Sequence, residues 1–137
     1  MEQAIGRPRV AKAYAWLISL VALLVIVQAV LFGAFYEKFN EDFIDVHWAV
    51  AFIFMIVLVL IITPLSYLAR FPRELRMGHL TVFLAVLWIV QWTLGSAITE
   101  DNERWVATLH IPNAFLIFGL GLYLTGKAHR AVRGRKG

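Results

Sequence analysis

Four long apolar stretches divide the chain, and short segments rich in charge separate them. The stretches cover residues 14–36, 43–68, 77–99 and 105–126. Each is close to the roughly 20 residues that an α-helix needs to cross a bilayer. Because lipid offers no hydrogen bonds to an open backbone, a segment that crosses it must be helical. The pattern therefore predicts four transmembrane helices.

The composition agrees with a membrane protein made of one domain. Of the 137 residues, 61% are hydrophobic, which is more apolar surface than a water-soluble domain of this length can bury. The connecting segments are too short to fold on their own, so residues 1–137 are expected to form a single domain. We expect an all-α fold, an integral membrane up-and-down four-helix bundle whose first partner is the lipid bilayer.

The basic residues fall on one side of the predicted bundle. Eleven of the 13 lysines and arginines lie in the two terminal segments and in the segment between the second and third stretches. Acidic side chains gather in the other two connections. By the positive-inside rule, both termini are expected in the cytoplasm, which makes this a multi-pass protein of the cytoplasmic membrane, the prokaryotic inner membrane. The net charge of +4 follows from this topology, and no nucleic-acid partner is expected.

The chain contains no cysteine. Disulfides, thiolate-ligated haem, c-type haem attachment and cysteine-ligated iron–sulfur clusters are therefore excluded. Histidine is the side chain that remains for transition-metal chemistry. His79 and His129 are expected near the cytoplasmic side, whereas His47 and His110 lie about one to two turns inside the outer ends of the second and fourth helices.

His47 and His110 thus share one layer, on helices that are diagonal in an up-and-down bundle. Adjacent helices pack about 8–10 Å apart, which is too close for a porphyrin between two ligands, whereas a diagonal pair leaves that space. The pair therefore predicts one b-type haem with its iron bound by both histidines. The alternative is a structural or interfacial pair. A zinc site is less favoured because only Asp45 and Glu103 are near as further ligands.

Small and polar residues at the same depth extend the predicted haem site. Gly33 on the first helix and Gly95 on the third would leave space for the porphyrin, although small residues in membrane helices also serve close packing. Arg104 would bind a haem propionate, or else pair with the acidic residues beside it. Asn113, one turn beyond His110, would bind a nearby backbone group or a propionate.

Two prolines and two glutamines lie within the apolar stretches. Pro112 has no amide hydrogen and predicts a local distortion of the fourth helix. Pro64 is expected to bend or end the second helix on its cytoplasmic side. Gln28 and Gln91 lie at similar depth, where interhelical hydrogen bonds are favoured over a contact with a quinone or with the haem edge.

Two motifs resemble one four-helix half of the haem A synthase family. They are QWTLGSAITEDNERWVATLHIPNAFLIFGL, residues 91–120, and DVHWAV around His47. In that family a Leu-Gly pair precedes a short outer loop and a helix that begins with a haem-ligating histidine, here His110. The family joins two such halves, and this chain would correspond to one. The chain also resembles small uncharacterised bacterial four-helix membrane proteins with a Leu-His-x-x-Asn-Ala element.

The chain departs from the family at the catalytic positions. The catalytic half is expected to carry a glutamate one turn before its second-helix histidine and an arginine directly after it, and here those positions are Ile44 and Trp48. Asp45 is in the wrong register. Trp48 is instead expected in the aromatic belt at the membrane surface. The resemblance therefore implies the haem pocket and not the oxidation of a farnesyl haem.

These patterns favour a cytochrome b-type protein that serves electron transport or haem handling, with no catalytic residue assigned. A single haem near one face cannot pass electrons across the whole membrane, so a larger membrane complex or a quinone would complete the path. Two alternatives remain open. One is a cofactor-free accessory subunit that stabilises a respiratory or photosynthetic complex, and the other is a half-size haem-modifying oxidase. An electron carrier or an accessory subunit is favoured over an enzyme.

Overall fold

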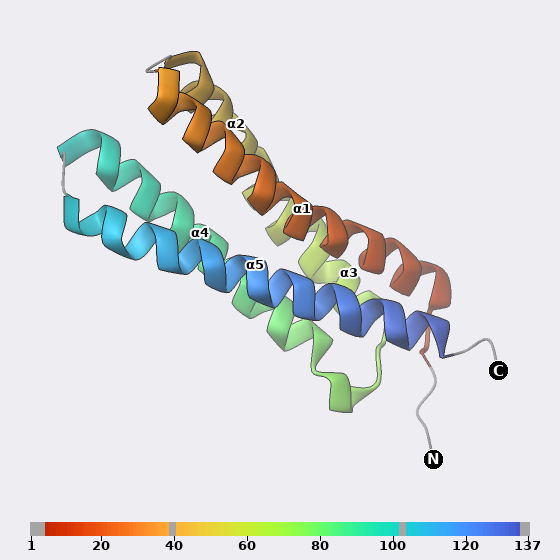
Figure 1. The fold of residues 1–137 in the computed structure, drawn as a ribbon. Coiled ribbons are helices and arrows are strands. Elements are labelled where there is room, and N and C mark those ends of the chain that lie inside the picture. Colours follow the sequence, from red (N-terminus) through yellow and green to blue (C-terminus); the bar gives the residue numbers. More distant parts are fainter. Residues whose placement is uncertain (1–4, 39–40, 102–103, 135–137) are drawn as a thin grey trace.

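The structure, a computed structural model, describes the backbone of residues 5–38, 41–101 and 104–134 (Figure 1). Side chains are described at residues 5–33, 42, 44–97 and 108–134. These parts of the chain are helical and contain no strand. The elements are α1 (Pro8–Lys38), α2 (Glu41–Val57), the π-helical turn η1 (Leu58–Ile62), α3 (Thr63–Leu68), the 3₁₀ turn η2 (Arg73–Leu75), α4 (Met77–Asp101) and α5 (Arg104–Arg133).

Four helical segments are long and apolar enough to cross a membrane, which agrees with the four predicted stretches. The helices run further than the apolar sequence does. α1 begins at Pro8 rather than at residue 14, and α5 ends at Arg133 rather than at residue 126. The added turns are rich in alanine, lysine and arginine, which are strong helix formers, and proline is well suited to a first helical position. The helices therefore continue past the apolar part of the chain.

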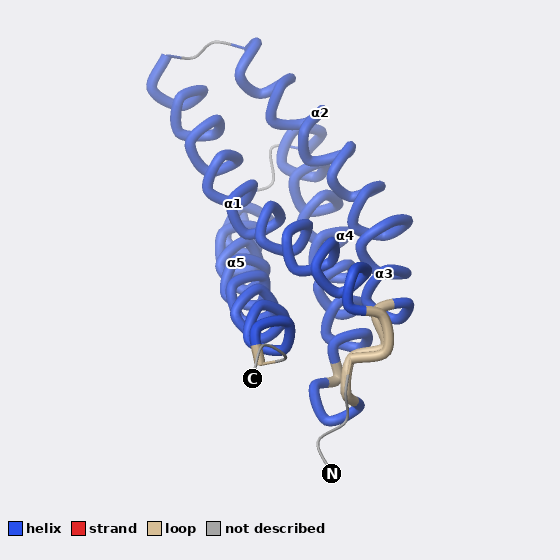
Figure 2. The backbone as a smooth tube through the Cα atoms, turned by 90° about the vertical axis from the view of Figure 1, so that its right-hand side faces the viewer, coloured by secondary structure: helices blue, strands red, loops and turns tan. Residues whose placement is uncertain are grey.

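The helices pack in the up-and-down order. α1 lies beside α2 and α5, and α4 lies beside α5 and the segment from α2 to α3. α2 and α5 are therefore diagonal, as the sequence predicts. In Figures 1 and 2 both termini and the connection from α3 to α4 lie at the same end of the bundle. We call this the basic end, and we call the opposite end, with the α1–α2 and α4–α5 connections, the acidic end.

The second membrane-spanning segment changes its helical winding in the middle. At η1 the amide of Thr63 donates to the carbonyl of Leu58, and the Thr63 hydroxyl donates to the same oxygen at 2.8 Å. This wide turn directly precedes Pro64, which has no amide hydrogen to donate. The helix then continues as α3. Pro64 is therefore accommodated by a π-helical turn and does not end the segment.

Pro112 behaves differently from Pro64. α5 is helical from end to end, so the distortion expected at Pro112 does not interrupt the helix. Pro112 is exposed. Its ring lies where no neighbouring helix restricts the small local adjustment that a proline requires.

The hydrophobic core extends from the middle of the bundle to the basic end. Its fully buried side chains come from every spanning segment, among them Tyr14, Ile18, Val21, Leu58, Ile62, Leu84, Ile117 and Leu124. Tyr14 also shares a hydrogen bond of 2.7 Å with Thr81 inside this core. In contrast, residues 29–33, 44–54, 89–97 and 108–112 include no buried residue. The acidic-end half is therefore packed more loosely than the basic-end half.

Candidate functional site

His47 lies on α2, against α1. Its Nδ1 atom is 3.2 Å from the backbone carbonyl oxygen of Gln28, and the Gln28 side-chain amide donates to the carbonyl of His47 at 3.0 Å. The ring of Phe32 lies 5.8 Å from the imidazole, centroid to centroid. Because a carbonyl only accepts hydrogen bonds, Nδ1 carries the proton in this contact. Nε2 then keeps its lone pair and is free to bind a metal.

His110 lies on α5, against α4 at Gly95. A Cβ atom added to Gly95 would lie 3.3 Å from Cε1 of His110 and 3.9 Å from the ring of Trp48. Glycine at this position therefore gives the imidazole its space. The ring interacts with the backbone of Gln91, and its Nδ1 atom is buried without a hydrogen-bond partner among the described residues. A buried polar atom without a hydrogen-bond partner is unusual in a folded protein.

The two histidines come from the diagonal helices α2 and α5, and their imidazoles lie within electrostatic range of each other. The segments that carry them, residues 44–54 and 108–112, include no buried residue, whereas the neighbouring Gln28 and Asn113 are buried. In Figure 1 the α1–α2 and α4–α5 hairpins lie close together at the basic end and spread apart toward the acidic end. The histidines thus lie where the hairpins separate.

Two other residues predicted around a haem, Gly33 and Arg104, make no contact with the histidines that the structure describes. A Cβ atom on Gly33 would meet nothing within 4 Å, so Gly33 makes no close packing contact, unlike Gly95. Arg104 begins α5, and its side chain lies outside the described residues. The prediction that Arg104 binds a propionate therefore stays a prediction.

Asn113 is buried and joins α5 to α4. Its side-chain amide donates to the carbonyl of Leu87 at 2.9 Å and to Oε1 of Gln91 at 2.8 Å. Asn113 therefore binds a nearby backbone group, the first of its two predicted roles. The predicted interhelical hydrogen bonds of both glutamines are present, because Gln28 joins α1 to α2 in the same way.

Two tryptophans near the histidines form a contact that the sequence did not predict. The rings of Trp48 and Trp92 meet edge to face at 6.1 Å between centroids. Nε1 of Trp92 is buried without a partner in the described part of the chain. Trp48 therefore packs between α2 and α4 instead of standing only in an interfacial belt. The spacing of Trp92 one turn before Gly95 is the signal that could have placed both on one helix face.

The remaining histidines lie apart from this site. His129 shares a hydrogen bond of 3.1 Å with the hydroxyl of Ser19 and packs edge to face on Trp16. His79 is exposed and lies near the ring of Tyr67 at the start of α4. Both belong to the basic-end half, so neither can complete a ligand set with His47 and His110.

The donor set of the site suits some metals and not others. Within the described residues, no group of three or more histidine, aspartate or glutamate side chains lies together. A structural zinc site normally needs four protein ligands, so these residues do not fit one. Two imidazoles without a third protein ligand among the described residues are a donor set that would suit a haem iron, because the porphyrin would supply the remaining ligands.

Comparisons with known proteins assign no family to the chain. No family model matches it, and no curated protein or solved structure is significantly similar to it. The likeness to one half of the haem A synthase family therefore rests on the two short motifs alone. The case for a function rests on the geometry around His47 and His110.

Proposed function

We propose that this membrane protein binds one b-type haem between His47 and His110, close to the acidic end, and serves electron transfer or haem handling. One observation carries the proposal. The two imidazoles lie on diagonal helices within electrostatic range of each other, on segments 44–54 and 108–112, which include no buried residue. Ionisable side chains within membrane helices are costly and usually functional.

The state of each imidazole supports the proposal. His47 is held through Nδ1 by the carbonyl of Gln28, which fixes the ring and leaves Nε2 as the ligand atom. Metal-binding histidines usually donate their other ring nitrogen in this way. His110 has a buried Nδ1 without a hydrogen-bond partner among the described residues. Bound haem would supply reversible one-electron chemistry at its iron.

The surroundings of the histidines would orient a flat cofactor and keep water away. Gly95 gives space beside His110, and aromatic rings flank both imidazoles, namely Phe32 beside His47 and the Trp48–Trp92 pair beside Gly95. The buried Nε1 of Trp92 is a donor without a partner in the described chain. These side chains would contact the haem and fix its orientation. No residue is proposed to take part in a covalent step.

The proposed topology places both termini in the cytoplasm and the haem near the outer face of a prokaryotic inner membrane. The support is the separation of charge, because the basic residues gather where the termini lie (Figure 1). A haem at this depth would exchange electrons with a partner at the outer face, such as a larger membrane complex or a quinone.

The test is the absorbance of protein purified in mild detergent from a haem-sufficient host, oxidised and then reduced with dithionite. We expect sharp low-spin b-type bands in the wild type and their loss in His47→Ala and in His110→Ala. The matched controls are His79→Ala and His129→Ala, which should keep the bands. Fully helical wild-type protein without haem would overturn the proposal and favour the cofactor-free accessory subunit.

A further inference from the structure

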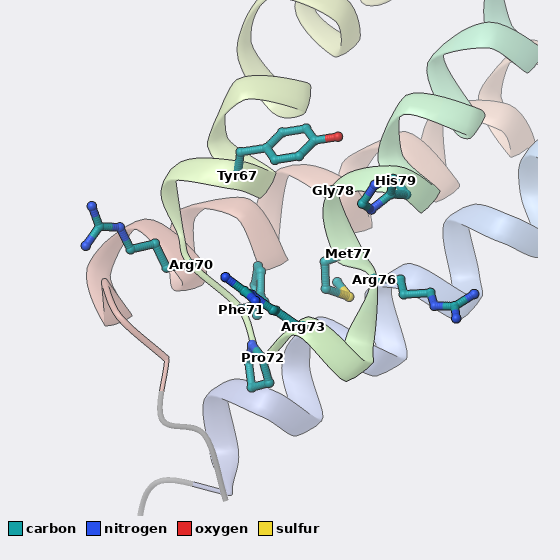
Figure 3. Close-up of a pocket in the computed structure, with 9 residues that line it drawn as sticks. All are labelled: Tyr67, Arg70, Phe71, Pro72, Arg73, Arg76, Met77, Gly78 and His79. Carbon is teal, nitrogen blue, oxygen red and sulfur yellow. The ribbon is translucent and has the colours of Figure 1, made fainter.

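A cavity of about 580 Å³ lies at the basic end, between α3 and the start of α4 (Figure 3). Its lining includes the arginines Arg70, Arg73 and Arg76 together with Tyr67 and His79. One membrane-spanning segment ends at Leu68 and the next begins at Arg73. The cavity is therefore level with the ends of the spans, where lipid headgroups meet the protein.

The positive charge of this cavity is not neutralised by the part of the chain that the structure describes. The three arginine side chains are exposed, and none forms an ion pair with a described carboxylate. Glu74 is the acidic residue of this connection, and it does not line the cavity. One guanidinium group can bind two oxygens of the same phosphate. Three guanidinium groups that line one cavity therefore favour a phosphate ligand.

The backbone holds two of these arginines in a conformation that suits glycine better. Arg70 has φ 52° and Arg76 has φ 49°, both in the left-handed region. Side chains other than those of glycine, asparagine and aspartate rarely occupy this region, and such backbone strain gathers at ligand sites. The sequence has arginine at both positions, one at each end of the connection.

Hydrogen bonds set the shape of the connection. The amide of Gly6 donates to the carbonyl of Arg70 at 3.1 Å, and the amide of Arg76 donates to the carbonyl of Arg73 at 3.1 Å. A Cβ atom on Gly6 would lie only 2.8 Å from Cβ of Arg70, so glycine is needed for this close approach. The segment before α1 thus fixes the arginine-bearing connection before any ligand binds.

The floor of the cavity is apolar and its rim is cationic. In Figure 3 the side chains of Arg70 and Arg76 extend to opposite sides of the connection, and Arg73 lies between them. Phe71 and Met77 contribute apolar surface to the lining. A free phosphate ion would use only the rim. A phospholipid would use both, because its phosphate is joined through glycerol esters to apolar acyl chains.

We propose that this cavity binds the headgroup phosphate of an anionic phospholipid at the cationic rim that Arg70, Arg73 and Arg76 line, with the start of an acyl chain against Phe71. The assignment does not depend on the haem proposal, because the two sites lie at opposite ends of the bundle. It differs from a diffuse attraction of basic tails to an anionic membrane, because one lipid is bound at one place.

The test is native mass spectrometry of detergent-solubilised protein equilibrated with equal amounts of phosphatidylglycerol and phosphatidylcholine. We expect the wild type to retain one phosphatidylglycerol in preference to phosphatidylcholine. The triple variant Arg70→Gln, Arg73→Gln, Arg76→Gln should lose this preference at least fivefold. A control triple variant, Arg9→Gln, Arg130→Gln, Arg133→Gln, removes the same charge from exposed positions at the same end and should keep it.

The outcomes separate the explanations. Equal retention of the two lipids by the wild type, or equal losses in both triple variants, would overturn the proposal. Release of the bound lipid by millimolar inorganic phosphate would identify free phosphate as the ligand and would also overturn it. If the first triple variant fails to fold, Arg73→Gln alone decides the question. It should lower the preference at least twofold, and an unchanged preference would contradict the proposal.

Discussion

The two halves of the bundle pack in different ways. In the basic-end half, side chains such as Leu84 and Leu124 are fully buried and form one continuous core. In the acidic-end half, segments 44–54 and 108–112 around His47 and His110 include no buried residue, and the buried polar side chains of Gln28 and Asn113 form hydrogen bonds between helices. The difference indicates that one half holds the bundle together and the other half provides the site.

This division has a physical basis. In a membrane, helices associate through close packing and interhelical hydrogen bonds, because lipid is as apolar as the side chains. The basic-end half gains its packing from interdigitated side chains. The acidic-end half is fixed mainly by hydrogen bonds of Gln28 and Asn113, and it leaves Nδ1 of His110 and Nε1 of Trp92 buried without described partners. Binding sites are commonly found in such less tightly packed parts of a fold.

The largest effect that tests this comparison is expected from two leucines on α5. Leu124 is 0% exposed and Leu109 is 50% exposed. Leu124→Ala should lower the free energy of unfolding by about 2–4 kcal/mol, because it leaves a cavity in the core. Leu109→Ala should have little effect. Unfolding in mixed micelles followed by circular dichroism measures both, and equal losses would remove the distinction between the halves.

A second pair of variants tests the space at the site. Gly95→Leu drives a side chain into the ring of His110 and should cost about 1–3 kcal/mol through overpacking. It should also abolish the b-type absorbance if the haem proposal is right. Gly33→Leu is the control, because a side chain there meets nothing close. Retained haem in Gly95→Leu would show that haem binding does not depend on the observed position of the His110 ring beside Gly95.

The hydrogen bond between Asn113 and Gln91 should have a smaller effect. Asn113→Ala removes the bonds to Gln91 and to the carbonyl of Leu87, and we expect a loss of about 1 kcal/mol. A double-mutant cycle with Gln91→Ala isolates the contact between the two side chains. Strictly additive losses would mean that this bond does not join α4 to α5 in the membrane.

The smallest effect is expected from Tyr14 in the tightly packed half. Tyr14→Phe removes the 2.7 Å hydrogen bond to Thr81 and keeps the packing of the ring, so the expected loss is about 0.6 kcal/mol. Tyr123→Phe, at an exposed tyrosine, serves as the control. A loss above that of Leu124→Ala would mean that the polar contact, and not the packing, holds the basic-end half together.

The sequence predicted the fold better than it predicted the surroundings of the site. The four spans, the up-and-down order and the diagonal placement of α2 and α5 follow from the length of the apolar stretches and the shortness of their connections. The interhelical bonds of Gln28 and Gln91 were also predictable, because polar groups within a membrane need partners. Trp48 was predicted less well, since its role depends on which neighbours it meets.

Apolar length by itself determined that the chain forms four helices long and apolar enough to cross a membrane. It also determined that His47 and His110 share a layer, because depth in a bundle follows from the rise per residue. Only the tertiary structure decided which way each side chain points. The helices are apolar on nearly all sides, so the sequence pattern does not show which face of each helix points into the bundle. The packing of the helices places His110 against Gly95 and Trp48 against Trp92.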